Sequence, residues 1–217
     1  VADPYRWLEG DVREHDDVSN WVDAQNEVSL GHLHAIPERE AIRNRLETLW
    51  NYEKTSRPIK VGGRYYFTHN NGLQNQAVWM VADSLDAKPR TLMDPNTWSE
   101  DGTVAISGTS FSRDGRFLAY AISEGGSDWK TWRIRDLNSN TDLPDLIEWS
   151  KFSGASWMPD GSGFYYSRYD KPEAGSALQA ANENQSLWFH RTNTPQSEDV
   201  LVHRDAEHPH WGWSAAV

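Results

Sequence analysis

The chain has 217 residues, no cysteine, and 32 acidic against 21 basic residues, which gives a formal net charge of −11. The length allows one or two domains, and the missing cysteines exclude disulfides and thiolate metal sites. The acidic balance argues against a nucleic-acid partner, because phosphate contacts need a basic face, and no apolar run approaches the roughly 18 residues of a membrane helix, so we expect no membrane partner.

Residues 1–52 predict a helical segment. An imperfect helical stripe follows the polar start at residues 16–17, and its members are Val18, Trp21, Val22 and Val28. Pro37 suits the first position of a second helix, in which apolar residues recur at helical spacing: Ile42, Leu46, Leu49 and Trp50. The pattern changes to strand-like alternation near residues 58–61, so we place the domain boundary after residue 52.

From residue 53 to residue 217, a unit of roughly fifty residues recurs three times. Each unit has a glycine-marked turn into an aromatic strand, at residues 63–67, 115–120 and 161–166. A strand that carries a tryptophan follows, with Trp79, Trp132 and Trp188, and then a short closing strand centred on Leu92, Leu146 and Leu201. Periods of this size predict β-propeller blades of four antiparallel strands, and the fold class is therefore mainly β.

Three blades do not close a propeller, which needs about four to eight. Residues 211–217 resemble the first, inner strand of a further blade. An open array would leave unpaired strand amides and an apolar edge. We therefore expect the chain to be a piece of a larger protein.

The connection between Tyr169 and Gln185 is longer than its counterparts near residues 70–75 and 124–130. Long connections without regular structure are usually either functional or disordered. Its composition leaves both alternatives open.

The nearest approach to a serine nucleophile motif, Gly-x-Ser-x-Gly, is at residues 212–216, around Ser214. It ends in alanine instead of glycine, and no helix follows, although the motif needs a turn between a strand and a helix. The repeat already explains this stretch as an inner strand. We therefore predict no catalytic residue in this chain.

His208 and His210 would share one face of a strand and could both reach a metal ion. No third ligand at a suitable spacing is evident, and Pro209 lies between them. Solvated loop histidines are the favoured interpretation, so we predict no metal and no cofactor.

Several strings are more specific than a generic propeller requires: residues 3–9 (DPYRWLE), 72–76 (GLQNQ), 94–96 (DPN), 101–105 (DGTVA), 126–129 (GSDW) and 196–199 (QSED). They resemble the prolyl oligopeptidase family, serine peptidases that cleave short peptides after proline. The resemblance extends over essentially the whole chain. It implies a seven-bladed propeller that caps an α/β-hydrolase domain, with residues 1–52 belonging to that catalytic domain and the catalytic triad following the propeller. By this template the chain holds the N-terminal segment, three blades and the first strand of a fourth.

The resemblance also implies substrate-binding residues. Residues 151–153 (Lys-Phe-Ser) match a family motif whose phenylalanine lines the substrate pocket, which makes Phe152 the principal site residue. The alternative is a core aromatic on an inner strand. Asp128 and Trp129 lie in a loop that resembles one facing the catalytic domain. Gly212 stands where mammalian members have a methionine, which implies a roomier pocket, and the loop between Tyr169 and Gln185 resembles a flexible interface loop that admits substrate.

Two functions follow as hypotheses. The first is a fragment of a prolyl oligopeptidase, inactive alone, whose propeller is a size-selective cap; its partners would be short proline-containing peptides and the remainder of its own chain. The second is a non-catalytic propeller scaffold that binds proteins. The sequence after residue 217 discriminates them, because only the peptidase continues to a nucleophile elbow. We expect a cytoplasmic location, with the periplasm as the alternative, since a leader could precede Val1.

Overall fold

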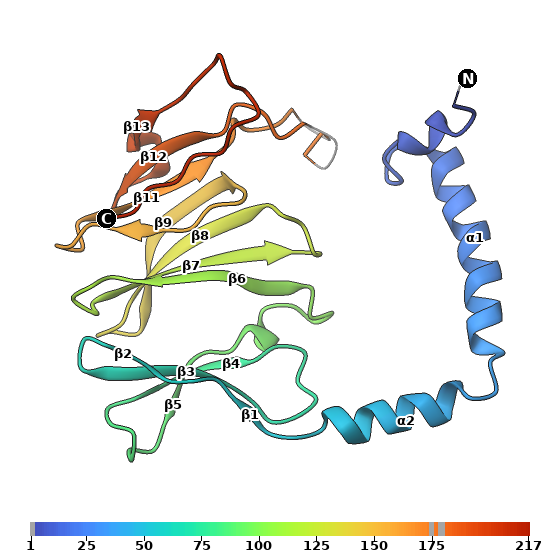
Figure 1. Ribbon diagram of the computed structural model, residues 1–217, viewed down its shortest axis with the longest axis horizontal. Coiled ribbons are helices and arrows are strands. Elements are labelled where there is room, and N and C mark those ends of the chain that lie inside the picture. The colour runs from blue at the N-terminus through green and yellow to red at the C-terminus, as the bar shows by residue number, and fades with distance from the viewer. Residues whose placement is uncertain (1–2, 174–175, 178–180) are drawn as a thin grey trace. The chain divides into compact units, whose positions relative to one another are not determined.

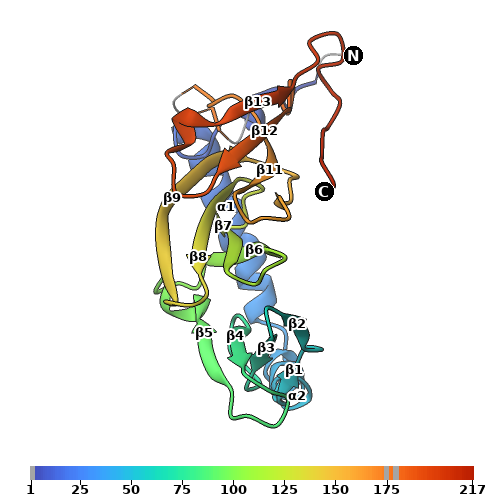
Figure 2. The ribbon, with the colours of Figure 1, turned by 90° about the vertical axis from the view of Figure 1, so that its left-hand side faces the viewer.

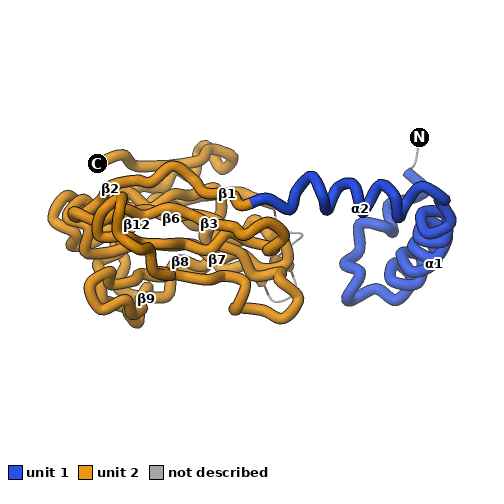
Figure 3. The backbone as a smooth tube through the Cα atoms, turned by 90° about the horizontal axis from the view of Figure 1, so that it is seen from below, with its two compact units in different colours: residues 1–52 blue, residues 53–217 orange. Residues whose placement is uncertain are grey.

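The computed structural model describes residues 3–173, 176–177 and 181–217 (Figure 1). The chain divides into two compact units, residues 1–52 and 53–217 (Figure 3). The first unit contains a 3-10 turn, η1 (Arg6–Glu9), and two helices, α1 (Asp16–His34) and α2 (Arg39–Trp50). The two expected helices are therefore present.

The second helix begins later than the sequence predicts. Pro37 precedes α2 by two residues instead of opening it, because residues 36–39 first form a turn in which the amide of Arg39 donates to the carbonyl of Ile36 (3.1 Å). Most apolar side chains of the two helices are exposed, and Val18 is the only described residue in them that is buried. None of the described helices combines the length and the apolar character that crossing a membrane would take.

The second unit consists of three antiparallel sheets, which follow one another in chain order (Figures 1 and 2). The strands of the first sheet are β1 (Lys54–Thr55), β2 (Ile59–Val61), β3 (Arg64–Asn70), β4 (Val78–Ala82) and β5 (Arg90–Met93). Those of the second are β6 (Val104–Phe111), β7 (Phe117–Glu124), β8 (Lys130–Asp136) and β9 (Thr141–Ser150). Those of the third are β10 (Ser156–Trp157), β11 (Gly163–Arg168), β12 (Ser186–Arg191) and β13 (Val200–His203). Short 3-10 turns, η2 (Pro95–Thr97) and η3 (Gln196–Glu198), precede β6 and β13.

The first sheet has the same plan as the others, although its first strand is divided in two. β1 and β2 pair with opposite ends of β3, through Lys54 with Asn70 and Ile59 with Tyr66. Pro58 lies between them, and proline has no amide proton to give to a strand ladder. Each sheet is thus a four-stranded antiparallel unit, as predicted.

The three repeat tryptophans lie on the third strand of their sheets. Trp79, Trp132 and Trp188 pair with Met93, Ile147 and Leu201 of the fourth strands, and a register shift lies beside each of them. Trp132 is almost fully buried, while Trp79 and Trp188 are partly exposed. The repeat therefore predicted both the strand order and the equivalence of these positions.

β7 explains how the sheets pack. Side chains alternate along a strand, and both faces of β7 are apolar. One face joins the cluster with the first sheet, formed by Leu118 and Tyr120 with Tyr66, Val81, Leu92, Met93 and Leu137. The other face joins the cluster with the third sheet, formed by Phe117, Ala119 and Ala121 with Trp132, Ile134, Ile147, Trp157, Phe164 and Tyr166. The core of this unit consists of these two layers between sheets.

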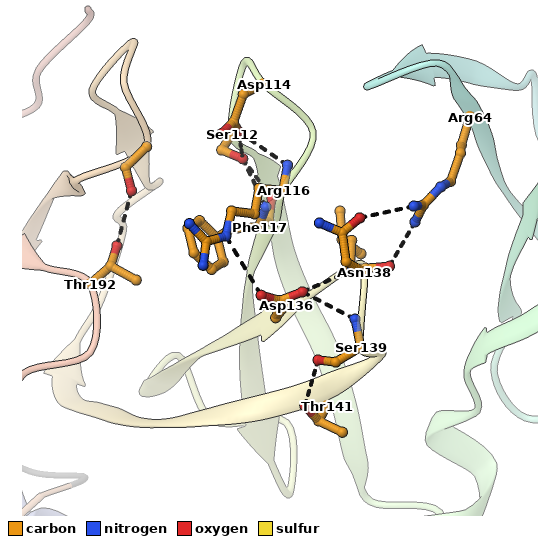
Figure 4. Close-up of polar contacts among 12 residues, drawn as sticks. Arg64, Ser112, Asp114, Arg116, Phe117, Asp136, Asn138, Ser139, Thr141 and Thr192 are labelled. Atoms are coloured by element: carbon orange, nitrogen blue, oxygen red, sulfur yellow. Dashed lines mark hydrogen bonds and ion pairs between the residues drawn. The ribbon is translucent and has the colours of Figure 1, made fainter.

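The turns at one end of the sheets also bind neighbouring sheets together (Figure 4). Arg64 of β3 donates to the carbonyl of Leu137 (2.7 Å) and to the side chain of Asn138 (2.9 Å), both at the β8–β9 turn. Gly62 and Gly115 approach so closely that a Cβ on Gly115 would lie 2.4 Å from the Cα of Gly62. Only glycine fits this contact, and its positive φ of 71° also favours glycine.

A buried ionic network joins the second and third sheets. His190 of β12 has no exposed surface; its Nε2 contacts Asp145 Oδ1 of β9 (2.8 Å) and its Nδ1 contacts Asp199 Oδ1 (2.6 Å). The Tyr166 hydroxyl donates to the other oxygen of Asp199 (2.6 Å). Burial alone lowers the pKa of His190, but the hydrogen bonds to the two carboxylates outweigh it and raise this pKa to about 9. The imidazole is therefore charged at neutral pH and holds two carboxylates from adjacent sheets.

Candidate functional site

The predicted site residues, which all belong to the unit of residues 53–217, lie at one end of the sheets. Asp128 and Trp129 lie on the β7–β8 connection, and Phe152 on the β9–β10 connection. The long connection joins β11 to β12. In an antiparallel sheet these connections share one end, the end toward which β7 points in Figure 1. Residues 174–175 and 178–180 of the long connection lie outside the described residues.

Phe152 is 60% exposed in this chain, and its contact with a substrate stays a prediction. Its φ is 51°, in the left-handed region, and Trp149 three residues earlier has a φ of 62°. Bulky residues seldom adopt this conformation, and it costs about 1–3 kcal/mol when they do. The two left-handed residues turn the chain sharply where β9 ends, and the turn places the ring of Phe152 at the surface.

Hydrogen bonds hold the backbone on both sides of Phe152. The carbonyl of Lys151 accepts from Gln185 Nε2 (3.0 Å), and the hydroxyl of Ser153 accepts from the amide of Ser167 (2.8 Å). Ser150 is also fixed, because its hydroxyl donates to the Ser167 carbonyl (2.8 Å). The strained segment is therefore anchored to the third sheet at three successive points around an exposed ring.

The structure brings Trp129 to the residue that precedes Phe152. Lys151 Nζ lies 4.0 Å from the centre of the Trp129 ring and donates to Asn182 Oδ1 (3.0 Å). Trp149 packs edge-on against Trp129. Burial lowers the pKa of Lys151, and the charge of Asp128 offsets part of this shift. Trp129, Trp149, Lys151 and Asn182 therefore form one cluster beside Phe152. Asp128 is exposed and acts on Lys151 through its charge.

Gly212 approaches the cluster from the C-terminal segment. A Cβ at this position would lie 3.2 Å from Gln185 Oε1, and the amide of Trp213 donates to the same oxygen (2.7 Å). Gln185 therefore contacts the segments of both Phe152 and Gly212. A roomier pocket at Gly212 stays a prediction.

Residues 211–217 are not a β-strand in the structure, contrary to the expectation of an inner strand. Several of their backbone groups bond to side chains; for example, Ser167 Oγ donates to the carbonyl of Trp213 and the amide of Val217 donates to Ser156 Oγ (3.2 Å). Ser214 lies in this irregular segment.

His208 and His210, which the sequence suggested as joint metal ligands, contact different residues. His208 Nδ1 bonds Asp205 Oδ2 (2.8 Å) and its ring stacks on Trp211, whereas His210 lies 3.9 Å from Glu183. Within the described ranges no group of three or more metal-capable side chains comes together.

Lys151 and Gln185 are members of the cluster that the sequence did not point to. Lys151 is only 7% exposed and Gln185 only 3%, although both residue types are usually at the surface. Lys151 belongs to the matched Lys-Phe-Ser motif, and that motif was the one available signal. Nothing local marks Gln185, because its partners lie 34 and 28 residues away.

A family profile described as "Prolyl oligopeptidase, N-terminal beta-propeller domain" matches residues 1–217. The chain belongs to the prolyl oligopeptidase family. It is 42% identical over 202 residues to the prolyl endopeptidase of Elizabethkingia meningoseptica. The aligned region covers 93% of this chain and 28% of that protein. It is 35% identical to prolyl oligopeptidase A of Amanita bisporigera, over 100% of this chain and 31% of that protein.

Solved structures of the family agree with the fold. Prolyl oligopeptidase B of Galerina marginata, bound to a 25mer macrocyclization substrate, matches with a TM-score of 0.88 at 30% identity, over 100% of this chain and 32% of that one. The predicted family and the predicted propeller fold are thereby confirmed. The chain spans about a third of the length of these relatives.

Proposed function

We propose that this chain is the N-terminal part of a serine endopeptidase of the prolyl oligopeptidase type, which cleaves short peptides after proline. In this proposal the propeller caps the catalytic domain and admits peptides while excluding folded proteins, and Phe152 contacts the bound peptide. Its partners are short proline-containing peptides and the remainder of its own chain. The exposed, left-handed and anchored Phe152 is the observation that carries the proposal.

The energetics of Phe152 favour a binding role over a structural one. An exposed aromatic ring contributes little to folding, and its backbone conformation is unfavourable by itself. Strained residues of this kind persist where the surrounding structure holds them, and they concentrate at functional sites. Covering the ring with a peptide would supply about 1–3 kcal/mol of apolar contact.

Substituting Phe152 in the full-length protein tests the proposal. We expect Phe152→Ala to lower kcat/KM by about 5- to 100-fold for peptides extended on the N-terminal side of proline. A minimal proline substrate that does not reach the ring should be cleaved at an almost unchanged rate. The control is Leu85→Ala, because Leu85 is 67% exposed on the β4–β5 turn at the opposite end of the sheet. Equal losses on both substrates, or no cleavage of proline peptides by the unaltered protein, would contradict the proposal.

A further inference from the structure

Side-chain contacts hold Lys151, the residue directly before Phe152, at both its main-chain carbonyl and its ammonium group. Gln185 holds the main-chain carbonyl of Lys151, and the Trp129 ring and Asn182 hold its ammonium group. Both Asn182 and Gln185 come from the end of the β11–β12 connection, more than thirty residues along the chain, so the Phe152 segment and this connection are fixed to each other.

We propose that Gln185 and Lys151 are positioning residues, which hold Phe152 in its left-handed presentation and thereby set the preference for extended peptides. This inference rests on the proposed function of Phe152. It adds that peptide preference depends on two side chains whose polar contacts fix the β9–β10 connection to the end of the β11–β12 connection.

Gln185 can do this because both ends of its amide are used. Nε2 donates to the Lys151 carbonyl (3.0 Å), while Oε1 accepts from the Trp213 amide (2.7 Å). The side chain is 3% exposed, so water cannot replace either bond without opening the cluster. One glutamine therefore ties together the β9–β10 connection, the start of β12 and the C-terminal segment.

Lys151 supplies the second restraint. A buried ammonium group is unfavourable unless it is compensated, and here a tryptophan face at 4.0 Å and the Asn182 oxygen at 3.0 Å compensate it. Trp129 is itself held, because its Nε1 donates to the carbonyl of Ala177 (2.6 Å). The ammonium group of Lys151 cannot move without breaking these contacts, which restricts the backbone of its neighbour Phe152.

The test measures, in the full-length protein, the ratio of kcat/KM for an extended proline peptide to that for a minimal one. The variants are Gln185→Met and Lys151→Met, which keep side-chain length and remove the polar contacts. Lys151→Arg keeps the cation over Trp129 and is the conservative rescue. Gln196→Met is the matched control, because Gln196 also bridges the third sheet to β9 through both amide ends, at Glu148 (3.1 Å each) and not at the Phe152 segment.

We expect Gln185→Met and Lys151→Met to lower the ratio by about three- to tenfold, because a small displacement of a contacting group is enough to weaken binding. Gln196→Met and Lys151→Arg should leave the ratio unchanged. In a Phe152→Ala background, Gln185→Met should produce no further fall, since the residue it positions is gone. Turnover of the minimal substrate shows that each variant is folded.

The inference is overturned if Gln185→Met and Lys151→Met leave the ratio at the level of Gln196→Met, or if their effects add fully to that of Phe152→Ala. These results differ from a failure of the proposed function, in which Phe152→Ala itself leaves the ratio unchanged. If Gln185→Met does not fold, the two substitutions of Lys151 decide the question alone.

Discussion

The backbone of Phe152 is strained, because a residue with a side chain disfavours the left-handed conformation that the β9–β10 connection requires here. Glycine has no such restriction. Substitutions at this position can therefore separate backbone strain from side-chain packing. The ring is 60% exposed, so removing it takes little from the core, while the backbone keeps its φ of 51°.

We expect Phe152→Gly to be more stable than Phe152→Ala by about 1 kcal/mol, since alanine keeps the strain and glycine relieves it at some entropic cost. The free energies of unfolding of the two variants, from denaturant titrations, give this difference. An alanine variant as stable as the glycine variant would show that the segment is not strained.

The sequence indicated Phe152 only through its family motif. A pattern of apolar and polar residues assigns a phenylalanine to the interior and a lysine to the surface, and at positions 151 and 152 the structure reverses both assignments. The reversal depends on contacts with Trp129, Asn182 and Gln185, which no local pattern reveals.

At the scale of elements, strand existence was predictable while the links between sheets were not. Alternation and the fifty-residue repeat identified the strands that carry Trp79, Trp132 and Trp188. In contrast, the ionic network of His190 joins β12 to β9 over 45 residues, and a lone histidine in a strand gives no indication of two carboxylate partners.

The His190 network predicts a stability that declines in alkaline solution. The pKa of His190 is raised from 6.5 to about 9, so the folded state binds its proton more tightly than the unfolded state. The contribution of protonated His190 to the free energy of unfolding is complete below pH 6.5 and is lost as the pH rises through about 9. The pKa of Tyr166, which faces Asp199, is raised as well by burial and by the Asp199 charge, so this phenol stays neutral in the same window.

We expect the free energy that protects the amides of β9 and β12 from hydrogen exchange to fall by on the order of 2 kcal/mol between pH 6.5 and 9.5. After correction for the intrinsic exchange rate, His190→Gln should abolish this dependence and lower the protection at pH 6.5. A pH dependence that persists in His190→Gln would assign the effect to other groups.

At the scale of the whole molecule, three sheets in chain order pack through two apolar layers, and the site residues of residues 53–217 gather at one end of them. Family membership accounts for this architecture. Within this architecture, Trp129 and Gln185 both contact Lys151, the residue before Phe152. Residues 211–217 also departed from expectation, because their backbone is bound by side chains instead of a neighbouring strand.

Direct contact between Phe152 and a bound peptide is the central claim, and photocrosslinking measures it. The full-length protein would carry p-benzoylphenylalanine at position 152, or at position 85 as the control, and would be irradiated with a proline-containing peptide. We predict that position 152 labels the peptide on the N-terminal side of its proline and that position 85 does not. Equal labelling at both positions, or labelling of protein alone from position 152, would contradict the account.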